Sequence, residues 1–437
     1  MISRVMIEDT GIPYGIQNIV NHLPLPNSVH TGDEFVLKFA PGVFIYLTGL
    51  VLLAAWRKHL PQGVTVTVDD SSCSDETQRL LTNTGFREII ETGHEFPSVQ
   101  KRIGRLPLHP ITNRFSKEAT VNEITSIFEE YAGHVKDVTP FKTLLSELCE
   151  NVLAHSEFVS PGYVCARIHE KIMKAEIAIA DTGIGIRESF IRGTNLGAKE
   201  RIARGAGAIE IAVDGLNSSK PVAPSGTLRS YYGFGLLITR RLVEENRGIL
   251  TVISDREVLS IEPYRRDQPR LHVPWAGTFV GLVLDLGNPL PLEEIYEEAT
   301  KKMVPETRVK TAATTDSTTW PLPTTQPINV ATSLHEPVDR QEKRVELRHY
   351  GSELLTRDAG TAIRADLASY LAAGMHLTVL LDGISDITPS VADEAFGKLA
   401  EIVGFQEFED SIKLEGGAPV VRRLIEFVLK TRSRSLS

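Results

Sequence analysis

The chain has 437 residues, a formal net charge of −9, 42% hydrophobic residues and 24% charged residues. This length suits two or three domains with cores of ordinary size, and the composition argues against disorder throughout. The acidic balance argues against nucleic-acid binding, because no basic excess is available to neutralise phosphates. Cys73, Cys149 and Cys165 have no metal-ligand spacing, so we expect a protein of the reducing cytoplasm.

Strand and helix patterns alternate over residues 1–100, which indicates an α/β domain. Glu34 to Phe39 and Gly63 to Val68 are expected to be strands, with an apolar helix from Val43 to Lys58 between them and a second helix from Asp75. Strands that alternate with helices favour a parallel sheet.

The uncharged stretch from Phe39 to Trp56 has about the minimum length that can span a bilayer. It contains Pro41 and Gly42 near its start, and a cluster of basic residues follows it. A buried strand and helix are the better interpretation, so we expect no contact with a membrane.

The segment from Thr139 to Ser156, TPFKTLLSELCENVLAHS, predicts an amphipathic helix. Apolar residues recur at three- and four-residue steps from Phe141 to Val152. Glu147 and Asn151 are four residues apart, so they share one helix face at the margin of the apolar stripe. An acid and an amide are thereby presented together at the edge of a core.

Three glycine motifs follow this helix. They are D-T-G-I-G beginning at Asp181 after a pair of strands over 163–169 and 174–180, Y-G-F-G ending at Gly235 before a helix, and G-T-F beginning at Gly277 in a closing strand. In this order and context the motifs resemble the GHKL ATPases, the family of gyrase, heat-shock chaperones, histidine kinases and MutL. The resemblance implies a Bergerat-type ATP-binding α/β sandwich over residues 101–286.

The resemblance also implies a site for ATP and Mg²⁺. Asp181 would accept a hydrogen bond from the adenine amine, and Thr278 would complete this contact through a water molecule. Asn151 would bind Mg²⁺. Glu147 is the candidate general base. Alternatively, it could be a partner of Asn151 or a surface charge. Glu150 is a weaker candidate because it points away from the apolar stripe. Backbone contacts with the nucleotide are expected at Gly183, Gly185, Gly233, Gly235 and Leu236.

Residues 190–232 are expected to form a mobile, glycine-rich lid over the nucleotide. Its cations Lys199, Arg201 and Arg204 could reach a γ-phosphate, although most of them are expected to face solvent.

A linker rich in Thr and Pro is expected over residues 287–344, and such a linker lets the flanking domains move. The last unit, residues 345–437, carries T-R-D-A from Thr356, a buried strand ending at Asp382 and S-V-A-D-E-A-F-G from Ser390. These motifs resemble the STAS-like domain found beside GHKL ATPases in bacteria. Ser390 could simply cap a helix. The basic run over residues 430–434 is expected to be solubilising surface.

The N-terminal domain also resembles a STAS fold, the domain of anti-sigma-factor antagonists. Thr48 is the only hydroxyl at the place of their phosphoacceptor. The expected fold is therefore a Bergerat-type sandwich flanked by an N-terminal and a C-terminal STAS-like α/β domain.

Within the GHKL family, the chain resembles the anti-sigma-factor kinases of bacterial partner switching. No helical hairpin with a phosphoacceptor histidine is recognisable upstream, Ala154 stands where histidine kinases carry lysine, and His155 matches the anti-sigma-factor kinases. One implied function is a kinase for Ser or Thr on a STAS-type partner, or on its own Ser390, Thr388 or Thr48. The second is an ATP-hydrolysing conformational switch.

A non-catalytic nucleotide sensor and interaction scaffold is the third possibility. The resemblance also implies a homodimer.

Overall fold

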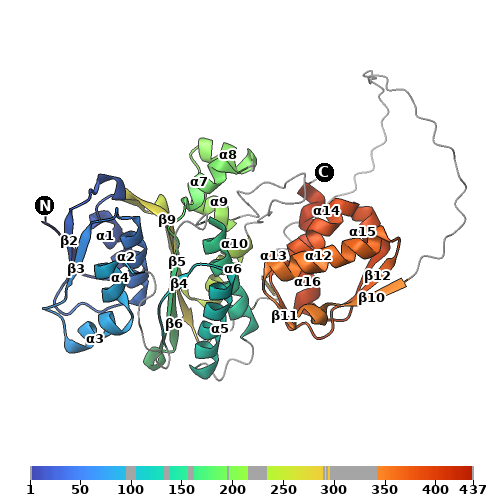
Figure 1. Cartoon of the computed structure of the whole chain (residues 1–437), viewed down its shortest axis with the longest axis horizontal. Helices are drawn as coiled ribbons and strands as arrows, with labels where there is room; N and C mark the ends of the chain where they lie inside the picture. Colours follow the sequence, from blue (N-terminus) through green and yellow to red (C-terminus); the bar gives the residue numbers. More distant parts are fainter. Residues whose placement is uncertain are drawn as a thin grey trace, which may run out of the picture.

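The computed structural model describes residues 2–94, 105–131, 138–155, 162–193, 196–214, 234–288, 291, 294–295 and 342–435. Over these residues the chain is a mixed α/β protein with several sheets, as the sequence predicts. We call its successive parts the N-terminal unit (residues 2–94), the central unit (105–295) and the C-terminal unit (342–435). Figure 1 shows the three units in a row, with the N-terminal unit in blue and the C-terminal unit in red at opposite ends.

The N-terminal unit is built on a parallel sheet with the order β1-β2-β3. Its strands are β1 (Ile2–Ile7), β2 (Glu34–Phe39) and β3 (Thr65–Asp69). Its helices are α1 (Tyr14–His22), the 3-10 helix η1 (Pro26–Ser28), α2 (Leu47–His59), α3 (Asp75–Asn83) and α4 (Phe86–Thr92). The parallel pairing is confirmed, whereas β1 and α1 precede the part of the chain for which the sequence pattern predicts structure.

Helix α2 begins at Leu47, later than the predicted start at Val43. The backbone N–H of Tyr46 donates to Oγ1 of Thr10 at 2.6 Å, and the Thr10 hydroxyl donates to the carbonyl of Phe44 at 3.3 Å. The prediction of a longer helix is wrong because a distant side chain takes this amide and Tyr46 is extended (φ −94°, ψ 141°).

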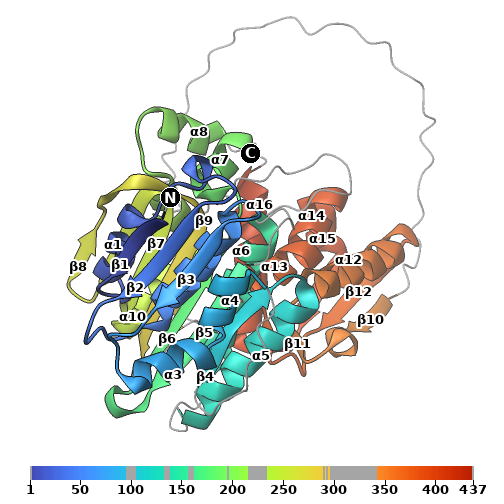
Figure 2. The same ribbon diagram turned by 60° about the vertical axis from the view of Figure 1, so that its left-hand side comes forward.

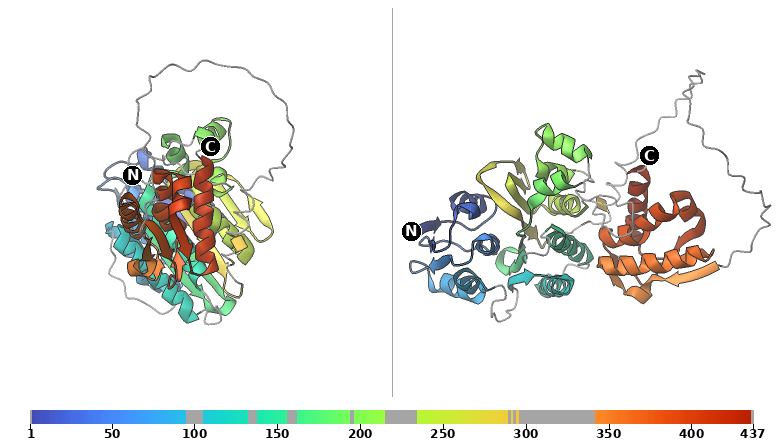
Figure 3. Two further views of the ribbon diagram at one scale, coloured as in Figure 1. Left: turned by 90° about the vertical axis from the view of Figure 1, so that its right-hand side faces the viewer. Right: turned by 45° about the horizontal axis from the view of Figure 1, so that its top comes forward.

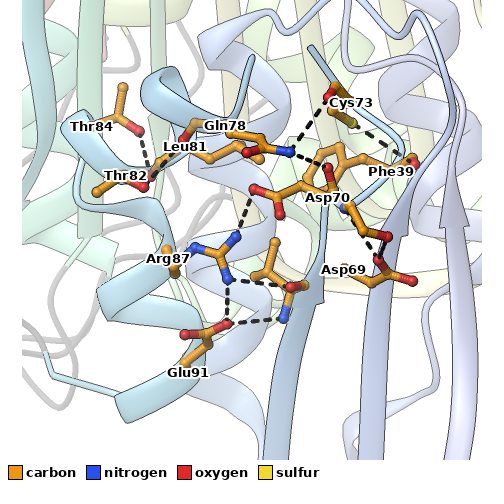
Figure 4. A network of polar contacts seen from close by, with 12 residues as sticks. Phe39, Asp69, Asp70, Cys73, Gln78, Leu81, Thr82, Thr84, Arg87 and Glu91 are labelled. Carbon is orange, nitrogen blue, oxygen red and sulfur yellow. Dashed lines mark hydrogen bonds and ion pairs between the residues drawn. The ribbon is translucent and has the colours of Figure 1, made fainter. Parts of the chain in front are cut away.

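Side chains fix the turn that follows β3 (Figure 4). Arg87 of α4 lies 2.6 Å from Oδ2 of Asp70 and 2.9 Å from Oε1 of Glu91. Nε2 of Gln78 in α3 donates to the carbonyls of Asp70 at 3.1 Å and Cys73 at 3.4 Å. Both helices after β3 are thereby tied to the carboxyl end of that strand.

The central unit contains a six-stranded sheet with the order β4-β5-β6-β9-β7-β8, in which neighbouring strands are antiparallel. The strands are β4 (Arg105–Ile111), β5 (Gly162–His169), β6 (Lys174–Ala180), β7 (Ile249–Glu262), β8 (Arg265–Asp267) and β9 (Arg270–Asp285). The predicted pair of strands is confirmed as β5 and β6. The closing strand is longer than expected, because β9 pairs with β7 from Arg270 onward.

Helices α5 (Arg114–Tyr131), α6 (Thr139–His155) and α10 (Phe234–Asn246) cover one face of this sheet (Figure 1). The predicted helix from Thr139 is thus confirmed as α6. The remaining helices of the unit are the 3-10 helix η2 (Glu170–Ile172), α7 (Gly185–Arg192), α8 (Leu196–Ala203) and α9 (Ala208–Asp214).

The other face of the central sheet is covered by the N-terminal unit, which the view of Figure 2 brings to the front. Helix α2 lies between its own sheet and strands β5 and β6, and every residue from Leu47 to Trp56 is buried. Burial on both sides explains why this helix is apolar all round. Among the described helices, none combines the length and apolar character needed to cross a membrane.

The C-terminal unit has a parallel sheet with the order β10-β12-β14 and a smaller pair of strands, β11 and β13. The strands are β10 (Glu342–Glu346), β11 (Glu353–Leu354), β12 (His376–Leu380), β13 (Asp386–Ile387) and β14 (Ile412–Glu415). The helices are the 3-10 helix η3 (Leu347–Tyr350), α12 (Arg357–Ala372), α13 (Pro389–Ala392), the π-helix η4 (Asp393–Gly397), α14 (Lys398–Val403), α15 (Phe405–Ser411) and α16 (Pro419–Ser435).

Strand β10 begins at Glu342, slightly before the expected start of the last unit at Val345. Most of the expected linker over residues 287–344 lies outside the described residues. Ile295, near the end of the described central unit, is buried in the same apolar cluster as α6 and the C-terminal helices.

Candidate functional site

Helix α6 has an apolar stripe that packs in the core and a polar stripe on its other side. Its apolar residues Phe141, Leu144, Leu145, Leu148 and Val152 are buried in the core beneath the central sheet, as their spacing predicts. The polar residues of the other face lie against α10 and the C-terminal unit. The helix therefore fixes a row of polar side chains on a rigid support.

Glu147 and Asn151 meet the start of helix α10, as the sequence order predicts they should if the motifs form one site. A Cβ atom placed on Gly235 would lie 2.9 Å from Nδ2 of Asn151 and 3.5 Å from Oε2 of Glu147. A side chain at 235 would therefore displace the Asn151 amide from its present position. Glu147 is only 7% exposed, so the alternative role as a surface charge is wrong.

Asp181 follows β6 and meets the residues that begin the closing part of β9. Its Oδ1 accepts the backbone N–H of Gly183 at 2.7 Å, and its own N–H donates to the carbonyl of Thr278 at 2.9 Å. A Cβ atom on Gly277 would lie 2.2 Å from the Asp181 carbonyl, so only glycine fits at this crossing. Burial raises the pKa of Asp181 to about 6, although hydrogen bonds from Gly183 and Thr278 oppose the rise.

The two groups lie on adjoining parts of the central unit. Val152, next to Asn151, packs against Gly162, where a Cβ atom would lie 2.3 Å from Cγ1 of Val152 and 2.9 Å from the carbonyl of Ala180. Ala180 directly precedes Asp181. Helix α6 is thus closely packed over the end of β6 at which Asp181 stands.

Gly185 completes the turn after Asp181. Its φ of +74° lies in the left-handed region that favours glycine, and a Cβ atom would lie 2.7 Å from Oγ of Ser254. The Ser254 hydroxyl accepts the N–H of Ile186 at 2.8 Å and donates to the carbonyl of Gly277 at 3.0 Å. The D-T-G-I-G and G-T-F motifs are therefore held together by one serine of β7, which the sequence analysis missed.

Other expected site residues have mixed outcomes. Leu236 lies in the first turn of α10 and packs partly buried against the core. Gly233 and the part of the expected lid that follows residue 214 lie outside the described residues. Arg204 pairs with Glu200 at 2.6 Å on an exposed surface, as expected for a cation facing solvent.

The donor set around Asn151 fits a hard cation. Mg²⁺ takes few protein oxygens and keeps waters or substrate phosphates as its other ligands. The Asn151 side-chain amide, whose Nδ2 lies nearest Gly235, stands near the Glu147 carboxylate, whereas no cluster of three or more His, Cys, Asp or Glu able to hold a metal ion occurs in the described parts of the chain. This donor set suits Mg²⁺ shared with a phosphate and does not suit a resident zinc ion.

Polar residues of α6 contact the C-terminal unit, which the sequence patterns did not predict. The right-hand view of Figure 3 shows the C-terminal unit, in orange and red, beside the helices of the central unit. Side chains at 142, 143, 146, 147 and 150 all contact the C-terminal unit. The pairs are Lys142 with Glu353, Thr143 with Asp386 at 2.9 and 3.1 Å, Ser146 with the Leu355 carbonyl at 3.4 Å, Glu147 with Ser390 at 3.1 Å, and Glu150 with Arg357 at 3.9 Å.

Ser390 does not cap its helix. The N-cap of α13 is Thr388, whose Oγ1 accepts the N–H of Val391 at 3.3 Å. The Ser390 hydroxyl instead donates to Oε1 of Glu147 at 3.1 Å, and its oxygen lies 3.0 Å from that of Thr388. The capping interpretation of Ser390 is wrong because Pro389 begins the helix one residue earlier.

Buried charges surround this contact. Glu150, on the side of α6 away from its apolar stripe, is also buried, and Nζ of Lys117 in α5 lies 3.0 Å from its Oε2. Arg357 lies between Glu150 and Glu394, at 3.9 and 3.6 Å. Burial raises the pKa of Glu147, while the positive charge of Arg357 opposes the rise. A carboxylate with a raised pKa is a better proton acceptor than a free one.

The basic run at the end of the chain is partly structural. Arg432 of α16 is 1% exposed and holds Asp393 with Nε at 2.6 Å and Nη2 at 3.0 Å. Such a two-point contact fixes the π-helix that follows Ser390. The interpretation of residues 430–434 as solubilising surface is therefore wrong at Arg432.

Thr48 lies on the opposite side of the central sheet from Glu147. It is fully buried in α2, its hydroxyl donates to the Thr10 carbonyl at 3.0 Å, and its N–H donates to Oε1 of Glu176 at 2.9 Å. The structure thus brings Ser390 and Thr388 to the α6 site and leaves Thr48 away from it.

Comparisons with protein-family models, with curated proteins and with solved structures give no match for this chain.

Proposed function

We propose that the central unit is a Bergerat-type ATP-binding domain of the GHKL kind, and that the chain uses it to carry out chemistry on the γ-phosphate of ATP. An antiparallel sheet with α5, α6 and α10 on one face supports this fold. The N-terminal and C-terminal units are proposed to be STAS-like, which their parallel sheets and packed helices support only in general architecture.

The observation that carries the proposal is the convergence of Glu147 and Asn151 on Gly235 at the start of α10. The start of a helix offers free N–H groups and a positive dipole end to phosphate. Asp181 lies at the end of β6 beside Gly183 and Thr278, where an acceptor would meet the adenine amine. The phosphates and the base would then bind at the two adjoining groups.

Each side chain has one task in this proposal. Asp181 orients the base, and Asn151 holds Mg²⁺, which supplies charge neutralisation at the phosphates when bound. Glu147 accepts the proton of the attacking hydroxyl or water. Gly235 permits close approach of the phosphates to the backbone of α10.

A kinase is favoured over a hydrolytic switch by one contact, the hydrogen bond from the Ser390 hydroxyl to Glu147. A base that already accepts a hydrogen bond from a serine is positioned for transfer to that kind of group. Hydrolysis coupled to a conformational switch, acting in bacterial signalling, is the second candidate. A sensor without catalysis is the third.

The experiment incubates the full chain with γ-labelled ATP and Mg²⁺ beside the Glu147→Gln and Asp181→Asn variants. Label transferred to protein and lost in Glu147→Gln supports the kinase. Release of free phosphate with no labelled protein supports the switch. If the parent binds ATP without turnover and Asp181→Asn does not bind it, the result supports the sensor without catalysis. No binding of ATP by the parent chain refutes the proposal.

A further inference from the structure

The C-terminal unit presents a hydroxyl to the base of the same chain. Ser390 is 7% exposed, and its Oγ lies 3.1 Å from Oε1 of Glu147. Oε2 of Glu147 faces the other way, toward Gly235. Glu147 therefore lies between this serine and the start of α10, where the proposed function locates the phosphates.

The backbone around Ser390 is held in place from both sides. Thr388 caps α13 at Val391, and Arg432 binds both carboxylate oxygens of Asp393 in the π-helix that follows. π-Helical turns are rare and occur often at functional sites. The serine is thus presented on a rigid segment, as a substrate group would be.

We infer that Ser390 is the phosphate acceptor of this chain in cis, and that its phosphorylation releases the C-terminal unit from α6. This inference rests on the proposed ATP site. The Ser390 oxygen attacks the γ-phosphorus, the bond from that phosphorus to the β,γ-bridging oxygen breaks, and ADP leaves. The hydroxyl proton passes to Glu147. The products are phosphoserine and ADP, and no other reactant is required.

The charge of phosphoserine at position 390 would favour release of the C-terminal unit. A phosphoserine carries a charge of about −1.5 to −2 at neutral pH. At this position it would meet the Glu147 carboxylate in a buried contact that holds only a hydroxyl. The nearby cations are already engaged, because Lys117 pairs with Glu150, and Arg357 with Glu150 and Glu394. Repulsion and desolvation therefore favour separation of the two units.

The remaining polar contacts of this interface can be replaced by water. Besides the apolar cluster that α6 and the C-terminal helices share, hydroxyl groups and ion pairs join the helix to the unit, and these groups can bind water once the interface opens. Phosphorylation would therefore act as a one-time switch that uncovers the polar stripe of α6 and the surface around Ser390.

The first test labels the full chain with γ-labelled ATP and maps the modified residue. The parent and Ser385→Ala, a control that removes an exposed hydroxyl of the same unit, should carry label at Ser390. Ser390→Ala should lose at least nine-tenths of the label while its affinity for ATP stays within about twofold of the parent. Parent-level label in Ser390→Ala would overturn the inference and leave the proposed function intact. An absence of ATP binding by the parent would refute the proposed function itself.

A mixing experiment separates transfer within one chain from transfer between chains. Glu147→Gln keeps the serine, and a longer, tagged Ser390→Ala chain keeps the base. Transfer in cis predicts label on neither chain of the mixture. Label on the Glu147→Gln chain would show transfer between chains and contradict the inference.

The release is tested by small-angle X-ray scattering before and after complete labelling. The radius of gyration of the parent should rise, and that of Ser390→Ala with ATP should not. A stoichiometrically labelled parent with an unchanged radius would overturn the release. Circular dichroism of both proteins checks that each is folded.

Discussion

The N-terminal unit meets the central sheet through α2, in which every residue from Leu47 to Trp56 is buried, whereas the C-terminal unit combines a shared apolar cluster with a row of hydroxyl and charged contacts on α6. The first contact belongs to one apolar cluster that includes β5, β6 and β9. Apolar burial is non-directional, and exposing buried apolar surface to water costs a large free energy. Polar pairs depend on exact partners, and their separated groups can bind water.

The two flanking units therefore contact the central unit in different ways, and we expect the two contacts to serve different functions. The N-terminal unit completes the core of the central sheet and is expected to remain attached. The C-terminal unit covers the candidate site through contacts that a single change in charge can disturb. Regulation is therefore expected at the second contact and stability at the first.

Removal of Arg357 should have the largest effect on the polar contact. Arg357→Ala leaves Glu150 and Glu394 without a buried cation that both approach. Breaking a buried ion pair from one side costs at most about 3–5 kcal/mol, and Lys117 and Lys398 still neutralise part of the two charges. We expect the C-terminal unit to separate, which small-angle scattering detects as a larger radius of gyration. Arg348→Ala, which removes an exposed partner of Glu346, should leave the radius unchanged, and a compact Arg357→Ala chain would contradict the assignment.

A cavity in α2 should lower stability without separating any unit. Leu52 is 0% exposed in the shared cluster, and Leu→Ala in a core costs about 2–5 kcal/mol. Denaturant titration should show this loss in the transition that the N-terminal and central units share. Ile402→Ala, at a side chain that is 64% exposed, should change the unfolding free energy by less than about 0.5 kcal/mol. A loss of structure confined to the N-terminal unit would show that the apolar contact is not the stronger one.

The polar contact should weaken as pH rises. Burial raises the pKa of Asp386 to about 7, although the Thr143 hydroxyl and Lys142 oppose the rise and Glu353 adds to it. A carboxyl exposed after separation has a pKa of about 3.9, so the docked state holds the proton more tightly. Its contribution is complete below about pH 4 and is lost as pH rises through about 7. The docked fraction, measured by scattering, should fall over this window, and Asp386→Asn should flatten the profile. A docked fraction that rises with pH would exclude this account.

Periodicity predicted the local elements well. The strands β5 and β6 and the helix α6 follow from alternation and from three- and four-residue spacing, because these patterns reflect burial against a neighbouring core. The start of α2 was not predictable in this way. It depends on Thr10, which is distant in sequence and accepts the N–H of Tyr46.

The candidate site was likewise predictable only where it depends on local sequence patterns. Glu147 and Asn151 could be placed on one face from their spacing alone, and their proximity to Gly235 agrees with the order of the motifs. The contact of Glu147 with Ser390 joins residues 243 positions apart. A polar stripe on a helix looks the same whether water or another unit covers it, so the sequence pattern could not predict this partner. The acidic and basic residues at 357, 393 and 394 were visible only as members of the T-R-D-A and S-V-A-D-E-A-F-G motifs.

Titration calorimetry of ATP with Mg²⁺ tests the central claim most directly, using the parent chain, Asn151→Ala and Glu147→Ala. We expect the parent to bind ATP more tightly with Mg²⁺ than without it, Asn151→Ala to lose this difference, and Glu147→Ala to retain binding while losing turnover. Equal Mg²⁺-dependent affinity in Asn151→Ala and the parent, or no binding by the parent, would contradict the assignment of this site to ATP.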